Sequence, residues 1–99
     1  MATRVAVMAV IVKNPDSVAQ LNGLLHQYSS YIVGRMGVPY HQRGVSIISV
    51  AMDAPMDVIS ALSGKVGRLP GITAKTVYAP EEALSWGREQ QNQKERNQL

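Results

Sequence analysis

Four short segments of the chain carry the hydrophobic pattern of β-strands. Residues 4–13 and 45–52 are apolar at most positions, so both faces of each segment are apolar. This pattern predicts two central strands that are covered on both sides. Residues 30–37 and 72–78 are predicted to be the second and fourth strands.

The second predicted strand leads into a connection that begins and ends with glycine. Residues 37–44 contain Pro39 as well as these glycines, so they are predicted to form the loop before the third strand. Strict alternation along the second strand places Ile32 and Met36 on one face and Arg35 on the other.

Two further segments repeat apolar residues at intervals of three and four, which is the spacing of one face of an α-helix. Asn14 is a favourable N-cap for the first helix, and Pro15 suits the first helical position, where an N–H has no partner. Asp53-Ala54-Pro55 is predicted to start the second helix, and Pro70-Gly71 to end it. The apolar stripes are Val18, Leu21, Leu25 and Tyr28 in the first helix, and Ile59, Leu62, Val66 and Leu69 in the second.

The predicted elements follow the order β-α-β-β-α-β. Short connections and right-handed crossovers favour one α+β architecture, a ferredoxin-like sandwich whose antiparallel sheet has the order 4-1-3-2 and carries both helices on one face. Residues 1–80 are expected to form this domain. Residues 81–99 are expected to be a polar tail that is disordered or forms a short helix, and Trp86 within it is expected to cover part of the body or to contact a partner subunit.

The face of the sheet away from the helices has no predicted cover. The central strands are apolar on this face too. A monomer would therefore expose an apolar patch larger than the area of roughly a few hundred Å² that monomers usually tolerate. Association of two such faces would bury on the order of 1,000 Å² or more. The chain is therefore expected to form a homodimer or a homotetramer.

The composition excludes several kinds of chemistry. The chain of 99 residues has no cysteine, which excludes disulfides, thiolate zinc sites, cysteine-ligated iron–sulfur clusters and cysteine nucleophiles. No serine has the setting of a hydrolase nucleophile, and no pair of carboxylates is left for acid–base catalysis. The chain is therefore expected not to be an enzyme and to need no cofactor.

Charge and hydropathy narrow the range of partners. The net charge is only +3, and every glutamate lies after Pro80, so the body is mildly basic and suited to an anionic ligand. The first and third strands carry no aromatic side chain on which bases could stack, so direct nucleic-acid binding is not expected. The apolar run 5–12 is too short to span a bilayer and no cleavage site follows it, so a cytoplasmic protein without membrane contact is expected.

His26 and His41 are the two histidines of the chain. They lack the i, i+4 spacing that places two metal ligands on one face of a helix. We expect both to be solvated and no metal site within one chain. The alternative is a metal site that assembles between subunits.

One end of the predicted sheet gathers candidate ligand-binding residues. The turn after the first strand and the link between the second and third strands meet there. Cations beside the free N–H groups of Asp16 and Ser17 at a helix start would favour a small anionic or amino-acid-like ligand, bound across a subunit boundary. The alternative is a solvated loop without a ligand. The candidate residues are Lys13, Asn14, Asp16, Ser17, Arg35, Tyr40, His41 and Arg43.

Three stretches of the sequence resemble a known family. They are YIVGRMGVPY at 31–40, RGVSIIS at 43–49 and ALSGKVGRLPGI at 61–72. These stretches are similar to the iron-only hydrogenase system regulators, and the resemblance extends over about residues 4–78. It implies an oligomer with a ferredoxin-like fold close to the ACT domains and to the C-terminal sensing domain of the nickel-responsive repressor. It also implies a role in controlling the assembly or expression of iron-only hydrogenase.

Two functional hypotheses follow. The first is a sensing or regulatory module that binds a small ligand at the basic end of the sheet. The second is an oligomeric interaction module without a small-molecule ligand, which acts on a partner protein through its surface or tail.

Overall fold

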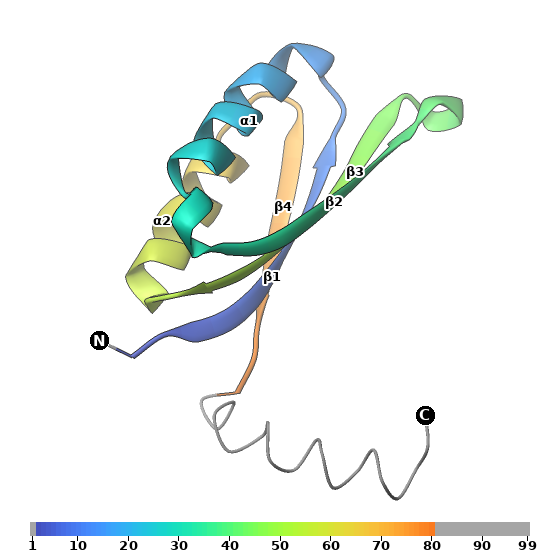
Figure 1. Cartoon of the computed structure of the whole chain (residues 1–99). Helices are drawn as coiled ribbons and strands as arrows, with labels where there is room; N and C mark the ends of the chain where they lie inside the picture. The colour runs from blue at the N-terminus through green and yellow to red at the C-terminus, as the bar shows by residue number, and fades with distance from the viewer. Residues whose placement is uncertain (1, 81–99) are drawn as a thin grey trace, which may run out of the picture.

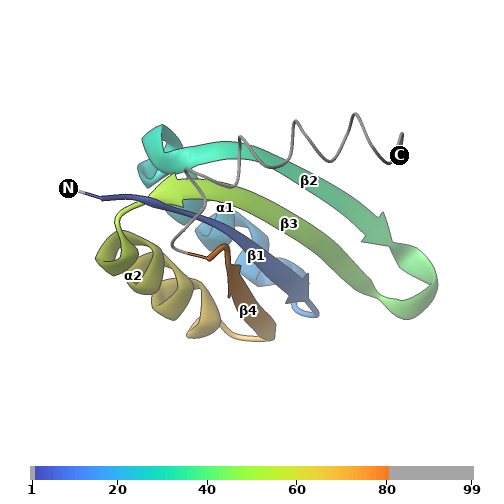
Figure 2. The same cartoon turned by 90° about the horizontal axis from the view of Figure 1, so that it is seen from below.

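The computed structural model of the chain describes residues 2–80 and places two α-helices against one face of a four-stranded sheet (Figures 1 and 2). Short 3₁₀ turns precede α1, β2 and β3. The predicted tail 81–99, including Trp86, lies outside the described residues. The elements are β1 (Arg4–Val12), α1 (Val18–Gln27), β2 (Ile32–Tyr40), β3 (Val45–Ala54), α2 (Met56–Gly67) and β4 (Ile72–Tyr78).

The sheet has the strand order β2-β3-β1-β4, and every neighbouring pair is antiparallel. This is the predicted order 4-1-3-2, so the predicted α+β, ferredoxin-like architecture is confirmed. β1 and β3 are the central strands, as their two apolar faces predicted. Ala9 of β1 illustrates the register, because it lies between Ser49 of β3 and Lys75 of β4.

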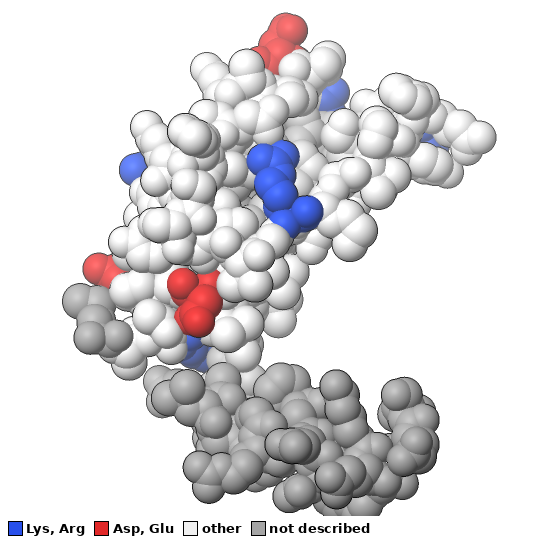
Figure 3. Space-filling model, viewed as in Figure 1, with Lys and Arg blue, Asp and Glu red and all other residues white. Residues whose placement is uncertain are grey.

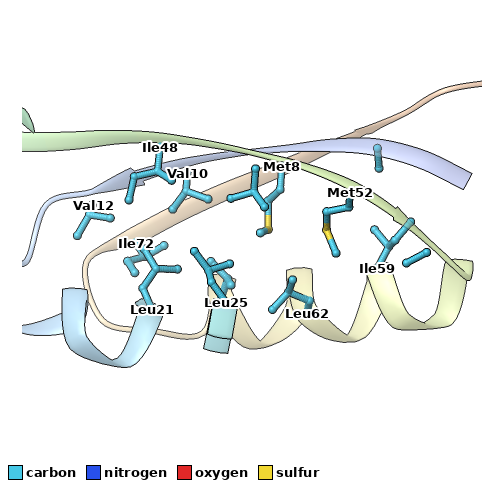
Figure 4. Close-up of a cluster of buried hydrophobic side chains, with 14 residues drawn as sticks. Met8, Val10, Val12, Leu21, Leu25, Ile48, Met52, Ile59, Leu62 and Ile72 are labelled. Atoms are coloured by element: carbon cyan, nitrogen blue, oxygen red, sulfur yellow. The ribbon is translucent and has the colours of Figure 1, made fainter. Parts of the chain in front are cut away.

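The hydrophobic core lies between the sheet and the two helices (Figure 4). Alternate residues of β1 and β3 point into it, including Met8 and Met52. The predicted helical stripes meet them from the other side: Leu21 and Leu25 of α1 and Leu62 of α2 are fully buried. Within residues 2–80 the core contains no phenylalanine or tryptophan, so close packing of branched aliphatic and methionine side chains fills it.

Both helix starts differ in detail from the prediction. Asn14 caps the first helix as expected, since its Oδ1 accepts a hydrogen bond from Asp16 N at 3.0 Å. The first turn is a 3₁₀ turn, however, and α1 itself starts at Val18. α2 starts at Met56, and Asp53 lies in β3 instead of at the helix start, because β3 continues to Ala54.

The predicted boundary of the second strand is wrong. β2 continues to Tyr40, and only His41–Gly44 separate it from β3. Pro39 suggested a loop, but β2 is an edge strand and needs ladder hydrogen bonds on one side only, so a residue without an N–H fits there. The resulting hairpin projects beyond the helical layer (Figures 1 and 2).

A β-bulge also changes the faces of β2. Ile32 pairs with Met52 and Gly34 with Ala51, so Val33 is the extra residue of the bulge. Ile32 lies on the helix side, whereas Met36, paired with Ser49, lies on the opposite face. The prediction that Ile32 and Met36 share a face is therefore wrong, because strict alternation fails at an inserted residue.

Arg4 joins the two ends of the described chain. Its guanidinium donates to the carbonyl oxygen of Ala79 at 2.7 Å and lies 5.2 Å from the ring centroid of Tyr78. Ala79 N in turn donates to the carbonyl oxygen of Val5 at 2.8 Å. The start of β1 and the end of β4 are thus fixed side by side. No helix within residues 2–80 has the length and hydrophobicity needed to cross a membrane.

Candidate functional site

Two pockets flank the base of the β2–β3 hairpin, one on each face of the sheet. The pocket on the face that carries the helices, here the helix-side pocket, has a volume of about 250 Å³. The pocket on the other face, here the outer pocket, has a volume of about 510 Å³. The first is lined by Val12, Lys13, Pro15, Val18, Pro39, His41, Gly44, Val45 and Ser46, and the second by Ile11, Lys13, Tyr40, Arg43, Gly44 and Val45.

Strand alternation determines which residues line which pocket. Val12 points to the helix side and its neighbour Ile11 to the other face. Tyr40 pairs with Val45 at the last rung of the hairpin ladder, and both line the outer pocket. Lys13 follows the end of β1 and lines both pockets.

Both pockets combine apolar walls with cationic groups. Lys13 and His41 line the helix-side pocket, and Lys13 and Arg43 line the outer pocket. No carboxylate is among the described residues that line either pocket. On the face of the described chain that Figure 3 shows, the charges are scattered and form no continuous basic or acidic patch. The hairpin end therefore favours small anions more than a long polyanion.

Arg35 does not join the other predicted site residues. Its Nη2 donates to Asn22 Oδ1 of α1 at 3.0 Å, in the middle of the edge strand. There it lines a separate hollow together with His26 and Ser29. The structure thus brings Lys13, Tyr40, His41 and Arg43 together and leaves Arg35 away from them.

The backbone N–H groups at the start of the first helix are not free. Asp16 N donates to Asn14 Oδ1, and Ser17 N donates to the carbonyl oxygen of Asn14, both at 3.0 Å. The expectation that these two groups would hold an anion is therefore wrong, because the turn itself uses them. The cationic side chains remain as the candidate anion ligands.

The side chain of Ser17 makes a structural hydrogen bond and is not available to a ligand. Its side chain is buried, and its Oγ donates to the carbonyl oxygen of Pro70 at 2.6 Å. Lys13 N donates to the carbonyl oxygen of Gly71 at 2.8 Å. We call this meeting of the β1–α1 and α2–β4 turns the turn junction; its residues are Lys13, Asn14, Ser17, Pro70 and Gly71.

Replacing Ser17 with alanine is expected to lower the free energy of unfolding by about 1–3 kcal/mol. The variant leaves the partly buried carbonyl of Pro70 without its donor, and an unsatisfied polar group costs roughly this much. Thermal or urea denaturation measures the difference. The control is Ser60→Ala, since Ser60 is exposed on α2. Equal stabilities for Ser17→Ala and Ser60→Ala would show that the Pro70 contact contributes nothing.

The two histidines lie apart in the described chain. His26 lines the hollow beside Arg35, whereas His41 lies at the hairpin turn. Among residues 2–80, no group of three or more His, Asp or Glu side chains is arranged to hold a metal ion. A site shared between subunits stays a prediction.

Sequence reasoning missed the apolar part of both pockets. Pro15, Val18 and Pro39 form walls of the helix-side pocket, and Ile11 and Val45 form walls of the outer pocket. The alternation of β1 and β3 indicates which of these apolar residues lie on each face of the sheet. It does not assign them to the pockets unless the end of β2 at Tyr40 is known.

The sheet order, the helical layer on one face and the hairpin-end pockets define a small α+β domain of the ferredoxin-like, ACT-like class. A family model described as "TM1266-like: Iron-only hydrogenase system regulator, putative" matches residues 4–76. The chain belongs to this TM1266-like family. Among proteins with curated descriptions, none matches the chain significantly.

The solved structures that are similar to the chain include the following two. An uncharacterized protein, TM1266 from Thermotoga maritima, is 33% identical, with 79% of this chain and 99% of that chain covered and a TM-score of 0.76. A formyltetrahydrofolate deformylase from Pseudomonas putida KT2440 is 15% identical, with 77% of this chain and 29% of that chain covered and a TM-score of 0.56. At this low identity the deformylase shows the fold alone.

Proposed function

We propose that the chain is a non-enzymatic regulatory module of the iron-only hydrogenase system that binds a small anion at its hairpin end. The family description supports the regulatory part of this proposal. The ligand part depends on one observation: Lys13 lies between two pockets that also present His41 and Arg43 but no carboxylate. Charge-assisted hydrogen bonds from such cations are the strong contacts that recognise carboxylate or phosphate groups.

The dimensions of the pockets set the ligand class. Ligand sites for small organic molecules commonly have volumes of roughly 300–1,000 Å³ and mainly apolar walls. The outer pocket falls in this range at about 510 Å³. Its apolar walls are Ile11, Tyr40 and Val45, with Lys13 and Arg43 as the polar groups. A carboxylate with a short apolar body, such as an amino acid or a small organic acid, matches this lining.

A second candidate function is an interaction module that binds no small molecule. One observation favours it: large apolar side chains are exposed on the face of the sheet opposite the helices, including Met36, Val38 and Val77. A surface of this kind is typical of protein–protein contacts. The two candidates are distinguished by whether any small anion binds.

Small anions are expected to raise the melting temperature of the full-length protein in a saturable way. The panel is phosphate, sulfate, acetate, glutamate and leucine, at constant ionic strength. A ligand at 100 times its Kd stabilises the folded state by about 2.7 kcal/mol. Arg43→Ala and Lys13→Ala each remove a charged contact and are expected to weaken binding roughly 10-fold or more.

Arg35→Ala is the matched control, since it removes the same charge as Arg43→Ala at a position outside both pockets. Calorimetric titration then gives the Kd for each variant. Unchanged binding in Arg35→Ala together with weakened binding in Arg43→Ala supports the hairpin-end site. If no anion of the panel binds, or if Arg35→Ala weakens binding as much as Arg43→Ala, the anion proposal fails and the ligand-free interaction module is favoured.

A further inference from the structure

The sheet face opposite the helices, here the outer face, is apolar over most of its area. β1 places Val5, Val7, Ala9 and Ile11 on it, and the neighbouring strands add further apolar residues. Ile47 at its centre is 46% exposed and Met36 near one edge is 68% exposed. By the strand register, the outer face comprises Gly34, Met36, Val38 and Tyr40 of β2, Val45, Ile47, Ser49, Ala51 and Asp53 of β3, the four residues of β1, and Thr73, Lys75 and Val77 of β4.

The size of this face matches what a stable dimer buries. Strands lie about 4.8 Å apart and rise about 3.3 Å per residue, so four strands of about eight residues cover roughly 19 Å by 26 Å. This flat footprint is about 500 Å², and the side chains that project from it make its accessible surface larger. A standard protein–protein interface buries about 800 Å² on each partner.

Charged groups lie at the margins of the face. Lys75 belongs to the edge strand β4, and Asp53 lies one residue before the end of β3. Ile47, Ser49 and Ala51 of β3 and the facing residues of β1 form an uncharged centre. Covering the centre therefore desolvates no ionised group there, which removes the main penalty against association.

The register reveals two neighbouring rows of opposite shape. Val38, Ile47 and Ile11 lie beside one another across β2, β3 and β1 and form a row of large residues. The next row lies two residues further along the strands. At its middle Ser49 pairs with Ala9, so the side chains there are small. The rung beyond the large row, Tyr40 with Val45, is also large. The rung beyond the small row pairs Gly34 with Ala51, which are both small, and Val7 lies beside Ala51.

We propose that the outer face binds a second copy of this chain, with a twofold axis that runs across the strands between these two rows. This axis places Ile47 and Ile11 of each copy against Ser49 and Ala9 of the other. The same operation places Tyr40 against Gly34 and Val45 against Ala51. Ile47, Ile11, Tyr40 and Val45 of each copy thus meet smaller residues, while Val38 meets Met36 in an apolar contact at the edge strand. One self-complementary surface serves both copies, as a twofold interface requires.

This interface shares Ile11, Tyr40 and Val45 with the outer pocket, so a dimer would cover that pocket, whereas the helix-side pocket lies on the other face. The test of the interface uses no ligand. Sedimentation of the full-length wild-type protein is expected to show a dimer at micromolar concentration. Ile47→Glu places a charge at the centre of the interface and is expected to raise the dimer dissociation constant at least 100-fold. The matched control is Met56→Glu, since Met56 is 48% exposed but lies at the start of α2, away from the outer face. Met56→Glu is expected to remain dimeric.

A size exchange tests the position of the axis. Ala9→Ile makes the face more apolar but fills the space that Ile11 of the other copy needs, so the dimer is expected to weaken at least 10-fold. The double variant Ala9→Ile/Ile11→Ala moves the large side chain by one rung and restores a large-to-small fit, so it is expected to recover most of the affinity. Circular dichroism and thermal melting confirm that each variant is folded.

Three results overturn the proposal. A monomeric wild-type protein at all concentrations up to about 100 µM would mean that another occupant covers the outer face. If Ala9→Ile dimerises more tightly than the wild-type protein, the outer face associates through its hydrophobicity alone and the twofold register is wrong. If Met56→Glu and Ile47→Glu lose the same dimer affinity, the dimer interface does not lie on the outer face.

Discussion

Replacing Val10 with aspartate is expected to abolish folding. Val10 is 1% exposed and points from β1 into the core between sheet and helices (Figure 4). A carboxylate at this position has no cationic partner in the core cluster, and a buried, unpaired charge costs several kcal/mol or more. A domain of about 80 residues has a total stability of roughly 4–12 kcal/mol, so this cost removes most or all of it. Loss of the cooperative thermal transition and of the native far-UV spectrum measures the effect.

The next residue provides the control. Ile11 is 42% exposed and points to the outer face, so Ile11→Asp leaves its carboxylate in contact with water in the monomer. This variant is expected to fold, with a melting transition close to that of a monomeric wild-type chain. A cooperative transition in Val10→Asp together with an unfolded Ile11→Asp would mean that the two faces of β1 are the reverse of those described.

Gly71→Ala is expected to destabilise the protein by about 3–4 kcal/mol, for two reasons. Gly71 has a φ of +69°, which side-chain-bearing residues adopt at a cost of about 1–2 kcal/mol. A Cβ at this position would also lie 2.6 Å from Asn14 Cβ and 3.0 Å from Asn14 N. The turn junction would have to open, and with it the hydrogen bond from Lys13 N to Gly71 O. Since 1 kcal/mol shifts the melting temperature of so small a domain by about 4–8 °C, a decrease of 12 °C or more is expected.

Gly44→Ala separates the two causes. Gly44 has a similar φ of +65°, but a Cβ there would meet no atom within 4 Å. This variant is expected to lose only about 1 kcal/mol, from the left-handed backbone alone. If Gly44→Ala and Gly71→Ala lose the same stability, the close approach of Asn14 contributes nothing, and backbone conformation explains both losses.

The sequence predicted the central part of the fold because its signals there are strong and redundant. β1 and β4 lie within a residue of their predicted bounds, and Leu21, Leu25 and Leu62 are buried as the helical spacing indicated. β2 was predicted poorly because an edge strand tolerates Pro39, and because a bulge at Val33 interrupts the alternation on which facing was predicted. Both effects depend on tertiary position, which local patterns do not contain.

The candidate site was predicted in part for the same reason. The order of the strands was enough to bring Lys13 and the hairpin residues His41 and Arg43 to one end of the sheet. It was not enough for Arg35, whose direction depends on the bulge, or for Ser17, whose side chain bonds to Pro70, 53 positions away in sequence. Contacts between distant turns have no signature in the pattern of either turn alone.

The adjacency of the two ends, fixed by Arg4, has a consequence for how such a unit can be used in larger proteins. Because β1 and β4 are hydrogen-bonded neighbours, residues 78–79 lie beside the start of β1. A unit with this property can be inserted into a surface loop of a host polypeptide, or repeated in tandem with short spacers, without pulling its ends apart. The hairpin lies at the opposite end of the sheet, so a host joined at these two ends would lie away from both pockets.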